Sequence, residues 1–185
     1  MNEKTWFTTV DIALIGVFSA LWATLNLTIG KMGFAWTRLP IFCDFSVFFT
    51  LLLTVWIVGK FGAASIVGVI GAIIVSFPAP SAHLIGLAAS SVLFDALMLG
   101  NKHKIRLKIR DIAVAVLVTA ASAFFAGITI GIFFTGNPIN EATMQSALTF
   151  WGWWHLVGGI MSAIITLPII GALEKANVRK IKGAQ

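Results

Sequence analysis

The segment "SALTFWGWWHLVGGIMSAIIT", from Ser146 to Thr166, decides the class of protein to which this chain belongs. It contains no Asp, Glu, Lys or Arg, and its only titratable side chain is His155. An α-helix needs about 20 mainly apolar residues to cross the roughly 30 Å hydrocarbon core of a bilayer. The segment is therefore predicted to be a transmembrane helix.

The composition of the whole chain supports the same class. Of its 185 residues, 58% are hydrophobic and 11% are charged, and the mean hydropathy is +0.96. A soluble domain contains about 25% charged residues, so this chain could not cover a water-exposed surface with polar groups. We expect an integral membrane protein. Its single cysteine, Cys43, excludes an internal disulfide framework.

Six apolar segments predict an all-α bundle of six transmembrane helices that forms one domain over residues 1–185. The predicted spans are 9–30, 41–59, 62–78, 82–100, 111–135 and 147–172. Between them lie short stretches of turn-forming residues, namely "GKMG", "GK", "PAPS", "GNKHK" and "GNPIN". No linker is long enough to separate two domains.

The distribution of lysine and arginine predicts the orientation in the cell membrane. With six spans, one side holds Lys4, Lys60, Lys102, Lys104, Arg106, Lys108, Arg110, Lys175, Arg179, Lys180 and Lys182. The other side holds Lys31 and Arg38. Both termini are therefore expected in the cytoplasm. The basic run "NKHKIRLKIRD" is interpreted as a loop that faces anionic lipid, and not as a nucleic-acid site.

Ionisable side chains inside a membrane are costly and mark candidate functional sites. Three lie within the predicted spans: Asp44, Asp95 and His155. Asp44 and His155 are expected at one level, roughly 10–13 Å below the outer surface, where they would line an outward-facing cavity. Alternatively they pair with each other, or Asp44 caps the helix that begins at Pro40. Asp95 is expected to pair with a lysine or arginine of a loop.

Helical spacing places Trp151, Trp154, His155 and Gly158 on one face of the last span. An interfacial belt of tryptophans is the alternative interpretation. Other residues that would complete a pocket on the outer side are Asn26, Thr28, Trp36, Arg38, His83, Asn137, Asn140 and Glu141. Indoles beside a carboxylate suit a flat heteroaromatic ligand, including a cationic one.

Known catalytic and phosphate-binding motifs are absent from the sequence, so neither an enzyme nor a cofactor is expected. His83, His103 and His155 lack the spacing of metal ligands. Small residues instead recur at four-residue intervals, as in Ala64-x-x-x-Gly68-x-x-x-Ala72, and such spacing lets helices approach closely. This packing is internal to the bundle or serves docking against another membrane protein.

The first span, "DIALIGVFSALWATL", and the segment "HLVGGIMSAIITLPIIGALEKANVRK" resemble the substrate-binding components of energy-coupling-factor transporters. In that family an A-x-x-x-A pattern on the first helix docks onto a transmembrane coupling subunit. Here Gly16-x-x-x-Ala20 and Ser19-x-x-x-Ala23 are the nearest matches, with glycine or serine replacing the leading alanine.

The resemblance implies capture of a vitamin-like small molecule from outside, with release driven by two cytoplasmic ATPases through the coupling subunit. Thiamine or its pyrimidine precursor is the favoured ligand, while Arg38 and His83 suit an anionic vitamin. The metal-binding branch of the family is not matched, because this chain begins Met1-Asn2. The alternatives are a stand-alone carrier or channel with Asp44, Asp95 and His155 as a proton path, and a membrane enzyme with His155 and Asp44 as an acid–base pair.

Overall fold

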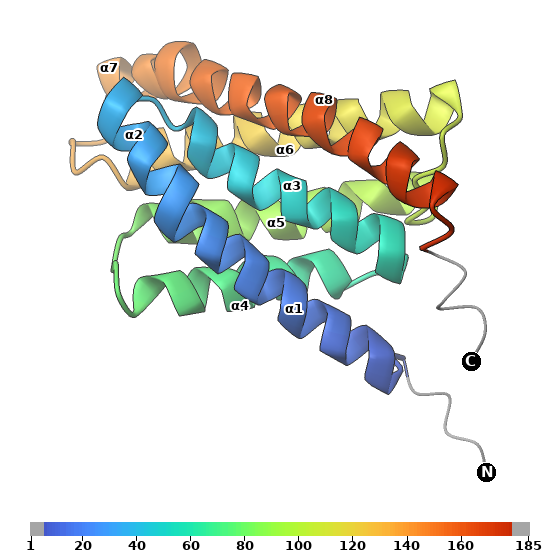
Figure 1. The fold of residues 1–185 in the computed structure, drawn as a ribbon. Coiled ribbons are helices and arrows are strands. Elements are labelled where there is room, and N and C mark those ends of the chain that lie inside the picture. The colour runs from blue at the N-terminus through green and yellow to red at the C-terminus, as the bar shows by residue number, and fades with distance from the viewer. Residues whose placement is uncertain (1–5, 179–185) are drawn as a thin grey trace.

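A computed structural model describes residues 6–178 of the chain, and every regular element among them is helical (Figure 1). The α-helices are α1 (Thr9–Leu25), α2 (Lys31–Thr37), α3 (Ile41–Val58), α4 (Ala63–Ser76), α5 (His83–Met98), α6 (Ile109–Phe133), α7 (Glu141–Ser146) and α8 (Trp153–Lys175). Two π-helical segments, η1 (Asn26–Gly30) and η3 (Ala147–Gly152), join α1 to α2 and α7 to α8. A short 3₁₀ segment, η2 (Leu99–Asn101), follows α5.

Five helical stretches are long and apolar enough to cross a membrane. They are Thr9–Thr37, Ile41–Val58, His83–Asn101, Ile109–Phe133 and Glu141–Lys175. The predicted span 62–78 corresponds to α4, which is apolar but has only 14 residues. At 1.5 Å per residue α4 is about 21 Å long, shorter than a bilayer core of roughly 30 Å. A sixth full span remains a prediction.

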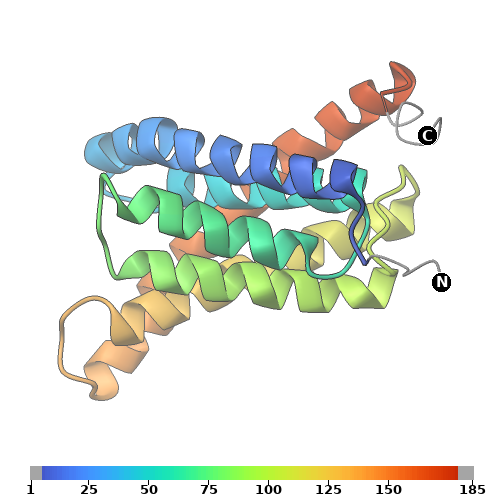
Figure 2. The same ribbon diagram turned by 90° about the horizontal axis from the view of Figure 1, so that it is seen from below.

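Helix α3 lies at the centre of the bundle and packs against α1, α4, α5, α6 and α8. Its apolar residues surround the whole helix and do not form one stripe, so it is stable only when covered on all sides. Phe48, Leu51, Leu52 and Val55 are accordingly buried. In both views α4 and α5 run side by side next to this central helix (Figures 1 and 2).

Small residues on α4 bring its neighbours close. A Cβ atom at Gly71 would overlap the ring of Trp22 on α1, and one at Gly68 would overlap the side chain of Ser91 on α5. Ala64 and Ala72 are buried on the same helix. The four-residue spacing along 64–72 therefore serves packing within the bundle, as one of the two interpretations predicted.

The expected turn at "GKMG" is wrong, because the chain stays helical from Thr9 to Thr37. Gly33 does not turn the chain. It lies so close to the ring of Phe42 that a Cβ atom would not fit. The chain reverses later, at Arg38, which has a left-handed φ of 59° and precedes Pro40. Gly33 thus permits close contact between α2 and α3 and is not a turn residue.

The two ends of the bundle differ in charge. We call the end with Lys60 and the loop 99–108 the basic end, and the end with the loops 77–82 and 134–140 the pocket end. Helix α1 begins and α8 ends at the basic end (Figure 1). Lys31 and Arg38 lie at the pocket end. Lys4, Arg179, Lys180 and Lys182 lie outside the described residues, and the side of the membrane that each end faces remains a prediction.

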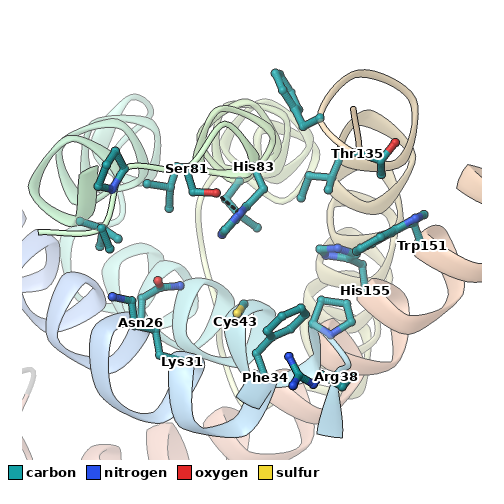
Figure 3. A pocket seen from close by; sticks show the side chains of 18 of the residues that line it. Asn26, Lys31, Phe34, Arg38, Cys43, Ser81, His83, Thr135, Trp151 and His155 are labelled. Carbon is teal, nitrogen blue, oxygen red and sulfur yellow. Dashed lines mark hydrogen bonds between the residues drawn. The ribbon is translucent and has the colours of Figure 1, made fainter. Parts of the chain in front are cut away.

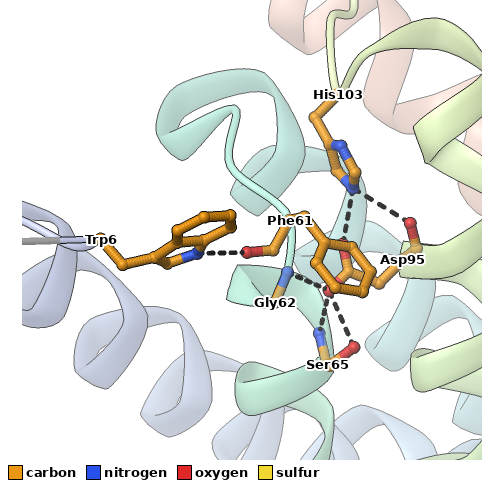
Figure 4. A network of polar contacts seen from close by, with 6 residues as sticks. All are labelled: Trp6, Phe61, Gly62, Ser65, Asp95 and His103. Carbon is orange, nitrogen blue, oxygen red and sulfur yellow. Dashed lines mark hydrogen bonds and ion pairs between the residues drawn. The ribbon is translucent and has the colours of Figure 1, made fainter.

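Asp95 on α5 caps the N-terminus of α4 (Figure 4). Its Oδ2 atom accepts hydrogen bonds from the Gly62 and Ser65 backbone N–H groups at 2.8 and 3.0 Å and from Ser65 Oγ at 2.8 Å. Its Oδ1 atom lies 2.8 Å from Nε2 of His103. The expected lysine or arginine partner is wrong, because the loop 99–108 inserts a histidine instead. The carboxylate joins three segments that are separated in sequence.

Candidate functional site

A cavity of about 740 Å³ opens at the pocket end (Figure 3). Its volume lies within the range of roughly 300–1,000 Å³ that small-molecule sites occupy. Its polar or charged lining residues are Asn26, Lys31, Arg38, Cys43, Ser81, His83, Thr135, Asn137 and His155. The main apolar lining residues are Phe34, Leu84, Leu87, Ile130, Phe134 and Trp151. The wall therefore combines aromatic surface with a few convergent polar groups.

His155 is the most buried ionisable group of the cavity wall, at 2% exposure. Its Nδ1 atom lies 2.9 Å from Oδ1 and 2.8 Å from Oδ2 of Asp44, which is fully buried behind it. Its Nε2 atom is buried and has no hydrogen-bond partner among the described residues. A buried polar atom without a partner is costly, so Nε2 is available to a ligand.

This direct contact places Asp44 and His155 at one level and matches the alternative in which they pair with each other, whereas the expectation that both line the cavity is wrong for Asp44. Gly158 makes the contact possible: a Cβ atom there would lie 2.7 Å from the Ile41 carbonyl oxygen and 2.8 Å from Cβ of Asp44. Helices α8 and α3 therefore cross at Gly158, one helical turn after His155. There the backbone of α8 lies directly against Ile41 and Asp44 at the start of α3. Asp44 lies behind His155 and orients its imidazole.

Both π-helical segments supply the cavity wall. Trp151 belongs to η3, and its ring centroid lies 6.3 Å from that of His155. Asn26 begins η1 and donates a hydrogen bond from Nδ2 to Ser46 Oγ at 3.2 Å. A π turn adds a residue to the α-helical register and is frequent at functional sites. Nothing in the sequence marks these turns.

One wall comes from α2, where the sequence predicts a turn and an outer loop. Lys31, Phe34, Ala35 and Arg38 line the cavity at the spacing i, i+3, i+4 and i+7. This periodicity is the sequence signal of one helical face. A helix over residues 31–37 would place all four side chains on the same wall. Neither Lys31 nor Arg38 forms an ion pair with another described residue.

Several predicted site residues lie elsewhere. Trp36 is 80% exposed and points away from the cavity, and Trp154 is half-buried but does not line it. The expected contributions of Thr28, Asn140 and Glu141 are also missing from the lining. Asn26, Arg38, His83, Asn137, Trp151 and His155 are brought together as expected. The interfacial belt thus describes Trp36 and Trp153 better than Trp151.

We expect Arg38→Gly to stabilise the fold while it weakens ligand binding. Arg38 ends α2 in a left-handed conformation that costs a residue with a Cβ atom about 1 kcal/mol, and glycine adopts it without that cost. The guanidinium facing the cavity is lost in the same change. Thermal unfolding in detergent should show a rise in Tm, and calorimetry should show weaker ligand binding. A lower Tm would contradict the strain argument.

No group of three or more His, Cys, Asp or Glu side chains within residues 6–178 is placed to hold a metal ion. Comparisons with protein-family models, with curated proteins and with solved structures find no match for this chain. The lining of the cavity is therefore the basis on which a function is proposed.

Proposed function

We propose that this protein is a membrane-embedded subunit that captures a small water-soluble organic molecule in the cavity at the pocket end. The observation that carries the proposal is the free Nε2 atom of His155, buried beside Trp151 in a cavity of about 740 Å³. An aromatic surface with one unpartnered polar atom holds and orients a flat ligand.

The lining also bears on the class of ligand. Lys31 and Arg38 face the cavity without ion-pair partners among the described residues, and no carboxylate lines it, because Asp44 lies behind His155. Two cations in such a wall attract a carboxylate or phosphate group. The lining therefore favours an anionic vitamin-like ligand over cationic thiamine, while the neutral pyrimidine precursor of thiamine remains compatible with it.

His155 adds a directional requirement. Its Nδ1 atom faces the acceptor oxygens of Asp44, so the proton of a neutral imidazole lies on Nδ1 and Nε2 presents a lone pair. A ligand N–H or O–H then donates to Nε2. The preferred ligand combines an aromatic ring with a hydrogen-bond donor and an anionic group some distance away.

By its resemblance to energy-coupling-factor substrate-binding components, we place the protein in the cell membrane with the pocket end outside. A transmembrane coupling subunit and two cytoplasmic ATPases would drive release. Ser19 and Ala23 are buried inside the bundle, whereas Gly16 and Ala20 are exposed on α1, and a Cβ atom at Gly16 would meet nothing within 4 Å. The docking proposal is therefore restricted to Gly16 and Ala20.

A ligand titration of the purified protein tests the proposal. Thiamine, its pyrimidine precursor and vitamins with a carboxylate or phosphate are titrated in detergent, with tryptophan fluorescence and calorimetry as readouts. We expect one anionic compound to bind saturably. Lys31→Gln with Arg38→Gln should weaken it at least tenfold, since a hydrogen bond to a charged group contributes about 1.5–3 kcal/mol.

The matched control is Lys108→Gln with Lys175→Gln, which removes the same charge from exposed positions outside the cavity. It should leave the affinity unchanged. Absence of saturable binding by every compound would contradict the proposal. Proteoliposomes that contain only this chain add a second test: a capture subunit binds the ligand without accumulating it, whereas a stand-alone carrier accumulates it.

A further inference from the structure

A second hollow, of about 320 Å³, lies at the basic end between the end of α5 and the beginning of α6. It is lined by Gly100, Asn101, Lys102, Lys104, Arg106, Arg110 and Asp111. It shares no residue with the large cavity and lies at the opposite end of the bundle. The capture of a ligand does not account for it.

The loop that forms this hollow is anchored at alternate residues. Asn101, His103 and Ile105 are buried, whereas Lys102, Lys104 and Arg106 are exposed. His103 bonds to Asp95 at 2.8 Å, and Ile105 is fully buried in the apolar core. Lys102, Lys104 and Arg106 nevertheless line one hollow, so the buried residues between them hold the three cations at one surface.

The backbone of the loop is fixed as well. Lys102 and His103 both adopt left-handed conformations, with φ values of 53° and 51°. Their N–H groups donate to the carbonyl oxygens of Leu99 and Met98 at 2.9 and 3.1 Å, and Asn101 Nδ2 donates to the Lys104 carbonyl oxygen. Two successive residues in this region persist only where surrounding contacts hold them. The cations therefore project from a defined scaffold.

The cations around the hollow are not neutralised by ion pairs within residues 6–178. Among the described residues, none of Lys102, Lys104, Arg106 and Arg110 forms an ion pair. Asp111 is the one carboxylate in the lining, and it is buried in the first turn of α6. Four cations around one carboxylate leave a net positive hollow, which attracts a phosphate group.

Exposed apolar side chains flank the hollow. Leu99, Leu107 and Ile109 are 51%, 45% and 84% exposed, and each is adjacent in sequence to a residue of the lining. Inorganic phosphate makes no favourable contact with apolar surface, whereas a phospholipid presents acyl chains beside its phosphate headgroup. Basic pockets at the ends of transmembrane helices are suited to such headgroups.

From this arrangement we infer that the hollow at the basic end binds the phosphate headgroup of an anionic phospholipid, with its acyl chains against Leu99, Leu107 and Ile109. Lys102, Lys104, Arg106 and Arg110 hold the phosphate. The buried anchors of the loop hold these side chains in place. The site is independent of the ligand captured at the pocket end.

Native mass spectrometry of the full chain, released from detergent, tests the inference. The protein is titrated with phosphatidylglycerol, with phosphatidylcholine of the same acyl chains, and with inorganic phosphate. About 0.15 M salt limits diffuse attraction to a Debye length of about 8 Å. We expect phosphatidylglycerol to bind at least tenfold more tightly than phosphatidylcholine, and inorganic phosphate to bind far more weakly than phosphatidylglycerol.

Lys104→Ser and Lys108→Ser form a matched pair, because both remove one lysine from the same loop but only Lys104 lines the hollow. Lys104→Ser should weaken phosphatidylglycerol binding about tenfold, and Lys108→Ser less than about threefold. Asn101→Ala keeps every charge and should also weaken binding. Equal effects of the two lysine changes, equal binding of the two lipids, or phosphate binding as tight as that of phosphatidylglycerol would overturn the inference.

Discussion

Asp44→Ala is expected to destabilise the protein by about 3–5 kcal/mol and to abolish ligand binding. The change leaves the buried imidazole of His155 without the carboxylate that lies 2.9 Å from Nδ1, and removal of one partner from a buried pair has an effect of this size. Free to rotate or to exchange its tautomer, the imidazole no longer presents Nε2 to the cavity. Chemical unfolding in detergent and calorimetric titration measure the two losses.

Replacement of both Asp44 and His155 distinguishes the effect of the pair on stability from its effect on ligand binding. The double change Asp44→Leu with His155→Leu leaves no uncompensated polar group, and apolar replacement of a whole buried pair is often neutral. It should recover most of the stability but none of the ligand binding. Thr54→Ala is the control on the same helix, since among the described residues the Thr54 hydroxyl donates only to the Thr50 carbonyl oxygen, and it should cost about 1 kcal/mol. A double variant that still binds ligand would remove His155 from the site.

Asp95→Ala should be the second most damaging single change, with a loss of about 3–5 kcal/mol. It removes the acceptor of two backbone N–H groups at the start of α4 and of the Ser65 hydroxyl, and it leaves His103 without its carboxylate partner. Hydrogen exchange should increase at Gly62 and Ser65 and in the loop 99–108, with the remainder of the bundle less affected.

Asp95→Asn is the graded comparison for this prediction. The amide keeps an acceptor oxygen for the N–H groups of α4 but loses the negative charge, so the expected loss is about 1–2 kcal/mol. Faster exchange spread evenly over all helices would show that Asp95 does not act as a local cap. If Asp95→Ala is as stable as the unaltered protein, the contacts of Asp95 in Figure 4 contribute little.

The sequence predicted the helical class and most of the membrane-crossing segments because long apolar runs without charge have few alternatives in structure. It also predicted the level shared by Asp44 and His155, since depth follows from counting residues along a helix. The pairing of their atoms at 2.9 Å depends on Gly158 and on the crossing of α3 and α8, which no local pattern encodes.

The errors have physical causes as well. The sequence predicts a turn at Gly30 and Gly33 because glycine is common in turns. Glycine is equally suited to a helix where a neighbouring ring lies too close for a Cβ atom, and the sequence alone does not distinguish the two cases. Trp36 was a candidate pocket residue because it lies in the predicted outer loop, close in sequence to the first span. Its side chain is exposed and does not face the cavity. The π turns that contain Asn26 and Trp151 interrupt the α-helical register, and a periodicity of 3.6 residues does not predict where such turns lie.

The short helix α4 has a consequence for the surrounding bilayer. A helix about 21 Å long in a core of roughly 30 Å creates hydrophobic mismatch. If α4 crosses the bilayer as the sixth predicted span, lipid beside it must thin, or headgroups and water must descend along it. Residues 79–81, which follow α4 and line the large cavity, would then lie in a local depression of the membrane surface. Solutes would reach the cavity through that depression, and the thickness of the host membrane would control access to it.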